Sequence, residues 1–215
     1  MKNLILMSVL LTGINITSNA QTTSSSTMES RNTPHFGLKA GINISNVYDS
    51  KGQDFEAKAK VGAALGGFVS IPFGKYIGIQ PEILYSQKGF KGSGSILGSP
   101  YSYTRTTNYL DIPLLLTLKP VNELSIVVGP QYSFLLSEKN KFANTLFTGA
   151  QEQQFNNDNI RKNTLSFIGG ADLNFDKVVI GLRAAWDVQN NAGDGTSTTP
   201  RYKNVWYQAT LGYRF

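Results

Sequence analysis

The chain has 215 residues, a formal net charge of +6 and no cysteine. This length suits one domain, and the lack of cysteine excludes disulfide bonds and a lipid anchor on an N-terminal cysteine. Lysine and arginine form no stripe along the sequence, and an export signal precedes the rest of the chain, so the basic balance does not indicate nucleic-acid binding.

Residues 1–20 have the three parts of a secretory signal peptide. Lys2 supplies the positive start, residues 4–11 the apolar core, and Ser18 and Ala20 the small residues before cleavage. A buried N-terminal helix or strand is the alternative. Residues 21–34 are rich in Ser and Thr and lack periodicity, which predicts a flexible periplasmic segment before a β-barrel domain at 35–215.

Eight later segments alternate between apolar residues and polar or small ones. In the last of them, Leu211, Tyr213 and Phe215 alternate with Gly212 and Arg214. Successive side chains of a strand point to opposite faces, so each segment predicts a strand with one apolar face. The predicted strands are 36–45, 61–73, 76–88, 106–119, 123–137, 163–175, 178–189 and 204–215.

The connections between the predicted strands alternate in length. Three are tight turns and four are long and polar. The turns are 73–75, 119–122 and 175–177, and the loops are 46–60, 89–105, 138–162 and 190–202. Short turns on one side and long loops on the other are typical of outer-membrane barrels, with both ends of the chain on the short-turn, periplasmic side.

Side-chain size predicts which face of each strand points inward. The interior of an eight-stranded barrel is just wide enough for its own side chains, so the face that carries bulky Leu, Ile, Phe and Tyr cannot fit there. The other face, which carries glycines and scattered charges, can fit inside the barrel. An apolar exterior is favourable only in lipid, and no run after the signal approaches the ~20 apolar residues of a membrane helix. The sequence therefore predicts an all-β, eight-stranded antiparallel up-and-down transmembrane barrel.

Aromatic residues lie near the ends of the predicted strands, as in the two girdles of a membrane barrel. A β-sandwich or a lipocalin with ordinary aromatic residues is the alternative. The predicted periplasmic girdle is Phe36, Phe73, Tyr76, Phe175, Tyr213 and Phe215, and the outer girdle is Tyr85, Phe134, Phe167, Trp186 and Tyr207.

Four stretches resemble the PorT-like family of Bacteroidetes outer-membrane β-barrel proteins. They are GLKAGINIS at 37–45, IPFGKYIGIQPEILYSQKGFK at 71–91, YLDIPLLLTLKP at 109–120 and GPQYSFLLS at 129–137. The resemblance covers about residues 36–215 and implies a small barrel in the outer membrane of a Gram-negative bacterium. One namesake is associated with assembly of a gliding-linked secretion system, whereas most members have no defined activity. We interpret Tyr213 and Phe215 as the C-terminal signal that the barrel-assembly machinery reads during insertion.

Seven charged residues are predicted to face the lumen, where buried charges need partners. They are Lys39, Glu82, Asp111, Asp172, Arg183, Asp187 and Arg214. Counting along the strands suggests two tiers, with Lys39, Asp172 and Arg214 near the periplasmic end and Glu82, Asp111 and Arg183 at mid-height. The favoured interpretation is a plug of paired ions, and the alternative is a polar path or a proton-linked gate.

Residues for catalysis or metal binding are scarce. The single histidine, His35, precedes the first predicted strand on the periplasmic side, so no Ser–His–acid set can form at the outer rim. There is no Cys/His ligand set, and Asp187 with Asp194 is a weak signal for a cation. The sequence predicts no enzyme, cofactor or metal site, and a lipid-modifying enzyme is a distant third possibility.

Two functional classes remain. The first is a structural or interaction module of the cell envelope, whose loops or periplasmic rim contact a protein partner, outer-membrane lipid or lipopolysaccharide. The second is a narrow porin-like conduit for small solutes. Basic residues at Lys139, Lys141, Arg161 and Lys162, in the longest predicted loop, suit lipopolysaccharide phosphates, although a solvated loop rim is the alternative.

Overall fold

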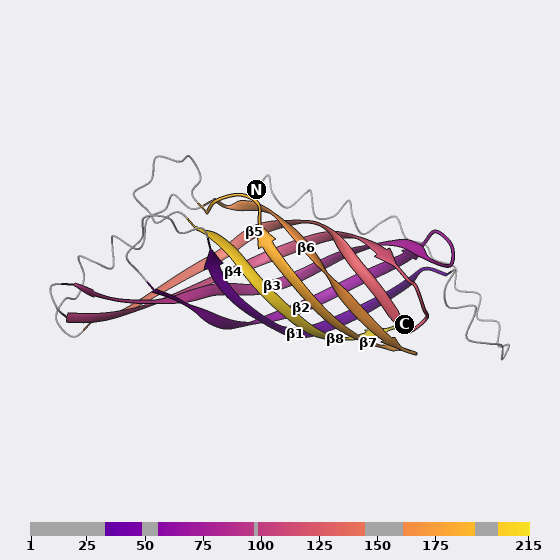
Figure 1. Cartoon of the computed structure of the whole chain (residues 1–215), viewed down its shortest axis with the longest axis horizontal. Helices are drawn as coiled ribbons and strands as arrows, with labels where there is room; N and C mark the ends of the chain where they lie inside the picture. The colour runs from indigo at the N-terminus through magenta and orange to yellow at the C-terminus, as the bar shows by residue number, and fades with distance from the viewer. Residues whose placement is uncertain (1–32, 49–55, 97–98, 145–160, 192–201) are drawn as a thin grey trace, which may run out of the picture.

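The eight strands of the computed structural model form one closed antiparallel barrel (Figure 1). Residues 33–48, 56–96, 99–144, 161–191 and 202–215 are described by the structure. The strands are β1 (His35–Tyr48), β2 (Glu56–Pro72), β3 (Ile77–Ile96), β4 (Ser99–Leu118), β5 (Leu124–Asn144), β6 (Asn163–Phe175), β7 (Val178–Asp187) and β8 (Lys203–Arg214). Each strand pairs with the next, and β1 pairs with β8. The predicted fold class is confirmed.

We call the end with the short β2–β3, β4–β5 and β6–β7 connections the turn end, and the opposite end the loop end. The predicted signal peptide at 1–20 lies outside the described residues, as do residues 21–32 of the predicted segment 21–34 and part of each of the four predicted loops. Within the described ranges, no helix is long and apolar enough to cross a membrane.

The outer wall of the barrel is apolar, as predicted. Leu114 and Leu211 are 52% and 61% exposed on this wall, whereas the inward-facing Glu82 is 4% exposed. Every strand contributes a large exposed apolar side chain: Leu38, Leu65, Ile83, Leu114, Ile126, Leu173, Leu182 and Leu211. Such a continuous surface is unfavourable in water and suits the acyl chains of a membrane.

Exposed aromatic rings surround the wall near both ends. At the turn end, Phe36 and Phe215 stack with their centroids 4.9 Å apart, which joins the two ends of the barrel chain. Toward the loop end, Phe167 and Trp186 lie 5.5 Å apart on neighbouring strands. All eleven residues of the two predicted girdles are exposed on the wall, and aromatic residues at these levels anchor a barrel in both interfaces of a bilayer.

The strands extend further at the loop end than the sequence predicted. The predicted loop at 89–105 is wrong, because β3 and β4 continue their ladder from Gly89↔Thr106 to Ile96↔Ser99. β5 likewise runs on to Asn144 rather than ending at 137. Figure 1 shows these strands projecting past the others, opposite the C-terminus. Phe90 and Tyr103 pack together on the inner side of this projection, which stabilises a ladder whose Gly, Ser and Thr residues resemble a loop.

Gly41 allows β1 and β8 to approach closely where the barrel closes. A Cβ at this position would overlap the carbonyl of Ala209 and lie 2.7 Å from the Cα of Thr210. We expect Gly41→Ala to displace β8 from β1, lowering both the folded yield and the urea midpoint of unfolding in micelles. Gel mobility before and after boiling reports the folded yield. Gly169→Ala is the matched control, because its Cβ would have no neighbour nearer than 3.7 Å. Equal urea midpoints for the two variants would contradict the prediction.

Candidate functional site

A buried ionic layer crosses the lumen in the half nearer the turn end. Arg183 lies at its centre: its Nη1 donates to both Glu82 carboxylate oxygens at 2.9 and 2.8 Å, and its Nη2 to both Asp172 oxygens at 3.1 and 3.0 Å. Lys39 Nζ lies 2.5 Å from Glu82 Oε2. These two cations and two carboxylates, which we call the ionic layer, sum to zero formal charge, and every charge in the layer has a partner of opposite sign.

The ionic layer joins residues that the sequence assigned to two tiers. Lys39 was placed near the periplasmic end and Glu82 at mid-height, but the two side chains meet directly. Counting residues from strand ends ignores the tilt of barrel strands, which brings positions of different count to the same height. The two-tier arrangement is therefore wrong. The amide of Gln80 completes the layer by donating to Glu82 Oε1 at 2.9 Å.

A second layer fills the middle of the lumen around Trp206. The side chain of Trp206 is 1% exposed and packs with four buried apolar side chains. Lys88 Nζ lies 3.7 Å from the Trp206 ring centroid and 2.9 Å from Asp111 Oδ2. A desolvated cation over an aromatic face that also pairs with a carboxylate is favourably placed. We call Trp206, Lys88, Asp111, Leu115, Val127, Ile168 and Ala185 the middle layer.

A third layer lies inside the projecting strands. Phe90, Tyr103 and Tyr202 pack edge to face, with Val47 beside them. Arg105 is buried here and pairs with Glu138, which also accepts a hydrogen bond from Asn140 at 2.7 Å. This loop-end layer extends the buried interior into the projecting strands, because its side chains are buried against one another there.

The remaining predicted lumen charges lie apart from these pairs. Asp187 accepts hydrogen bonds from Ser166 Oγ at 2.7 Å and from the Asn204 side chain at 2.5 Å, so hydrogen-bond donors rather than a salt bridge hold it. Arg214 lies at the turn end and donates to the carbonyl oxygen of Asp176. It is only half-buried and does not reach the ionic layer, which corrects its placement with Lys39 and Asp172.

Sequence reasoning missed two of the buried cations, Lys88 and Arg105. Lys88 ends the predicted third strand on the inward face, so its alternation with Glu82 and Ser86 was a usable signal. Arg105 fell in a predicted loop and had no assigned face. The apolar residues of the middle layer gave a weaker signal, because a single Leu or Val among polar neighbours does not stand out.

A narrow space lies between side chains of the ionic layer and their neighbours. It amounts to about 190 Å³ between atoms, part of it open to solvent. Its walls are Lys39, Phe68, Gln80, Asp172, Val179, Arg183, Thr210 and Gly212. None of these residues belongs to the middle layer.

The described residues contain no cluster of three or more His, Cys, Asp or Glu side chains that could hold a metal ion. His35 lies at the turn end and contacts Thr33 Oγ1 at 3.1 Å. The carboxylates of the ionic layer are fully engaged with cations.

Three solved structures illustrate the likeness of this chain to known barrels. The attachment invasion locus protein Ail of Yersinia pestis is 14% identical (TM-score 0.44), covering 85% of this chain and 99% of that one. OprG of Pseudomonas aeruginosa is 13% identical (TM-score 0.44), covering 85% and 95%. Neisserial surface protein A is 9% identical (TM-score 0.44), covering 84% and 97%. No curated protein matches the chain.

The sequence profile of a protein family matches most of the chain. The profile is that of the outer membrane protein beta-barrel domain, and it matches residues 19–190, which are 172 of the 215 residues. The match agrees with the closed eight-stranded barrel and its apolar wall, and it supports a location in the outer membrane of a Gram-negative bacterium. This chain belongs to the outer membrane protein beta-barrel domain family.

Proposed function

We propose that this small outer-membrane barrel is a structural or interaction module of the cell envelope and that it does not conduct solutes. The observation that carries the proposal is the filled lumen. The ionic layer and the middle layer lie one above the other, and the bulky residues at their centres, Arg183 and Trp206, are 4% and 1% exposed. An eight-stranded barrel has little bore to spare beyond its side chains, and these layers occupy it.

The projecting part of β3, β4 and β5 is the best-placed surface for contacts. It extends past the outer aromatic girdle, so it stands clear of the acyl chains. Its inner side is buried by the loop-end layer, which holds the projection in a fixed shape. Rigid elements present binding groups more accurately than mobile ones do. We propose that this projection contacts an envelope protein or lipopolysaccharide, while the barrel serves as its anchor.

Single-channel recording in planar bilayers tests the filled lumen. We expect the folded protein to give no steady conductance. A larger porin with a water-filled bore, recorded under the same conditions, shows that the recording detects an open channel. Gel mobility before and after boiling confirms that each inserted sample is folded. Steady conductance from the unaltered barrel would support the alternative, a narrow porin-like conduit, and would overturn the proposal.

Several finer assignments complete this proposal. Residues 1–20 act as a cleaved signal peptide and 21–34 as a flexible periplasmic segment. The chain belongs to the PorT-like branch of Bacteroidetes barrels, on the motifs given above, and the barrel-assembly machinery inserts it through the aromatic end at Tyr213 and Phe215. The protein has no catalytic role. Mass determination of the N-terminus of the protein from outer membranes tests the cleavage site after Ala20.

A further inference from the structure

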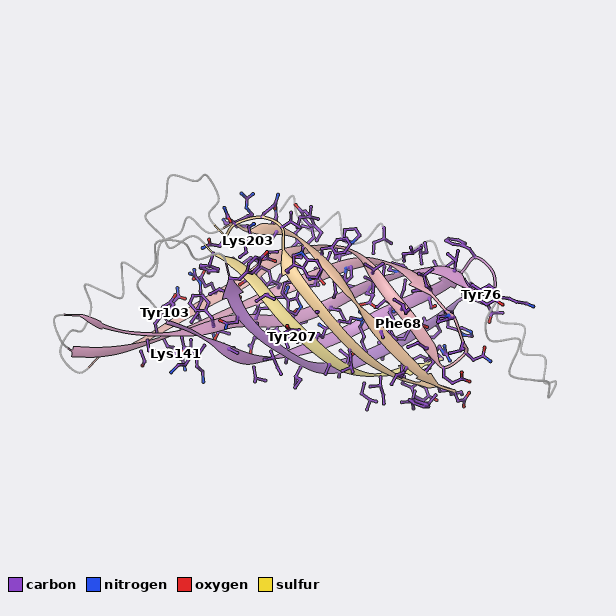
Figure 2. The ribbon with its side chains drawn as sticks, viewed as in Figure 1. Phe68, Tyr76, Tyr103, Lys141, Lys203 and Tyr207 are labelled. Atoms are coloured by element: carbon purple, nitrogen blue, oxygen red, sulfur yellow. The ribbon has the colours of Figure 1, made fainter. Side chains whose placement is uncertain are left out.

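A row of lysines crosses the outer face of the projecting sheet. Cross-strand pairing places Lys58 of β2 opposite Lys91 of β3, Lys91 opposite Thr104 of β4, and Thr104 opposite Lys141 of β5. The three lysine side chains are exposed, while their neighbours Phe90 and Tyr103 point into the loop-end layer. We call these three lysines the lysine row; Figure 2 shows its Lys141 on the projection.

The next cross-strand row toward the membrane has the same character. Gly89 pairs with Thr106, and Thr106 with Lys139, whose side chain is also exposed. Neither row contains a carboxylate. The nearest acidic side chain on β5, Glu138, points to the inner side and pairs with Arg105. Within these two rows the outer face therefore offers ammonium and hydroxyl groups to an anion, and the next row outward places Glu56 opposite Ser93.

This arrangement needs an explanation, because like charges directly opposite each other on neighbouring strands are destabilising. Lysines often protect the edges of sheets against unwanted pairing, and Lys141 fits that role. Lys91 does not, since β3 is paired at this residue with both β2 and β4. A lysine in the middle of the sheet that faces Lys58 is better explained by an anion that binds both.

The height of the lysine row indicates the kind of anion. Tyr85 of the outer girdle lies six residues before Lys91 on the same strand, which is roughly 15 Å of climb for a tilted strand. At this level the wall of an outer-membrane barrel faces the phosphorylated sugars of lipopolysaccharide rather than its acyl chains. We propose that the lysine row, with Lys139, binds lipopolysaccharide phosphates and holds the lipid against the projecting sheet.

This inference rests on the proposed function, in which the projection is the contact surface, and names its partner. The test compares Lys91→Gln/Lys141→Gln with Lys75→Gln/Lys177→Gln, which removes the same charge at the turn end. Each folded protein, in zwitterionic detergent, is titrated with fluorescent rough-type lipopolysaccharide carrying its inner-core phosphates, and with the same lipid after dephosphorylation. From the usual attraction of a lysine for an anionic lipid surface, we expect about thirtyfold weaker binding for the first variant.

Three results would overturn the inference: unchanged binding by the Lys91/Lys141 variant, equal weakening in the turn-end variant, or equal binding of the dephosphorylated lipid. Conductance separates this inference from the proposed function. If the barrel does not conduct and the Lys91/Lys141 variant binds lipopolysaccharide normally, the proposed function stands and the lipopolysaccharide site is wrong. If the barrel conducts and the lysine row binds lipopolysaccharide phosphates, the proposed function is wrong and the lipopolysaccharide site stands.

Discussion

Replacing Arg183 by Met is expected to lower the free energy of unfolding by about 3–5 kcal/mol, because it leaves Glu82 and Asp172 in the lumen with Lys39 as their only cation. The guanidinium makes four of the hydrogen bonds in the layer, two to each carboxylate. Lys39 cannot take the place of this guanidinium, because its ammonium group already contacts Glu82. Urea titration of the folded barrel in micelles, followed by tryptophan fluorescence, measures the change.

Two further variants separate charge imbalance from lost packing. Arg183→Met/Glu82→Gln restores a neutral layer of Lys39 and Asp172, so we expect it to be more stable than Arg183→Met alone. Lys75→Met removes one charge from an exposed turn position and should change stability little. If Arg183→Met were as harmless as Lys75→Met, or if the double variant were the less stable of the pair, the ionic layer would not be a set of mutually compensating charges.

Truncating Trp206 to Ala is expected to lower the free energy of unfolding by about 3–5 kcal/mol. Its ring fills the middle layer, where it contacts buried Leu115 and Ile168, and it lies beneath the ammonium of Lys88. Removing it leaves a cavity and takes the aromatic face from the lysine at the same time. The measurement is again the urea midpoint and slope of the folded barrel in micelles.

The other tryptophan is the natural control for this experiment. Trp186 is 41% exposed on the outer wall and contacts Phe167 in the outer girdle. We expect Trp186→Ala to have the smaller effect, because detergent or lipid fills the space that the ring vacates. Lipids brominated on their acyl chains should quench Trp186 and spare Trp206. Equal stability losses, or strong quenching of Trp206, would show that Trp206 is not packed inside the lumen.

Strand number and orientation could be predicted because both are encoded locally. In β8, alternation of Leu211 and Tyr213 with Gly212 assigns each residue to a face without knowledge of any other strand. The steric argument that bulky residues cannot enter a narrow bore then fixes which face is outside. Both steps use only the period-two pattern and the volumes of the side chains. Neither requires knowledge of the register between neighbouring strands.

The contents of the lumen depended on information that one strand does not carry. Lys39 and Glu82 are 43 residues apart and meet only because the tilt of β1 and β3 brings them to one height. Trp206 was readable as inward-facing, but its place beneath Lys88 follows from the registers of several strands. The projection was missed for a related reason: Phe90 and Tyr103 give little periodicity alone and stabilise the ladder only when packed together.

The ionic layer has a consequence for how the chain enters the bilayer. Lys39 and Glu82 both belong to the first three strands, and Asp172 and Arg183 to the β6–β7 hairpin. Each of these portions contributes one cation and one anion to the ionic layer, so the layer itself adds no net charge to either portion if it inserts before the rest. The bonds between Arg183 and Glu82 then form across the seam when the early and late portions meet. Correct closure is thereby stabilised by side-chain bonds as well as by the β1–β8 backbone hydrogen bonds, which discriminates against closure in a shifted register.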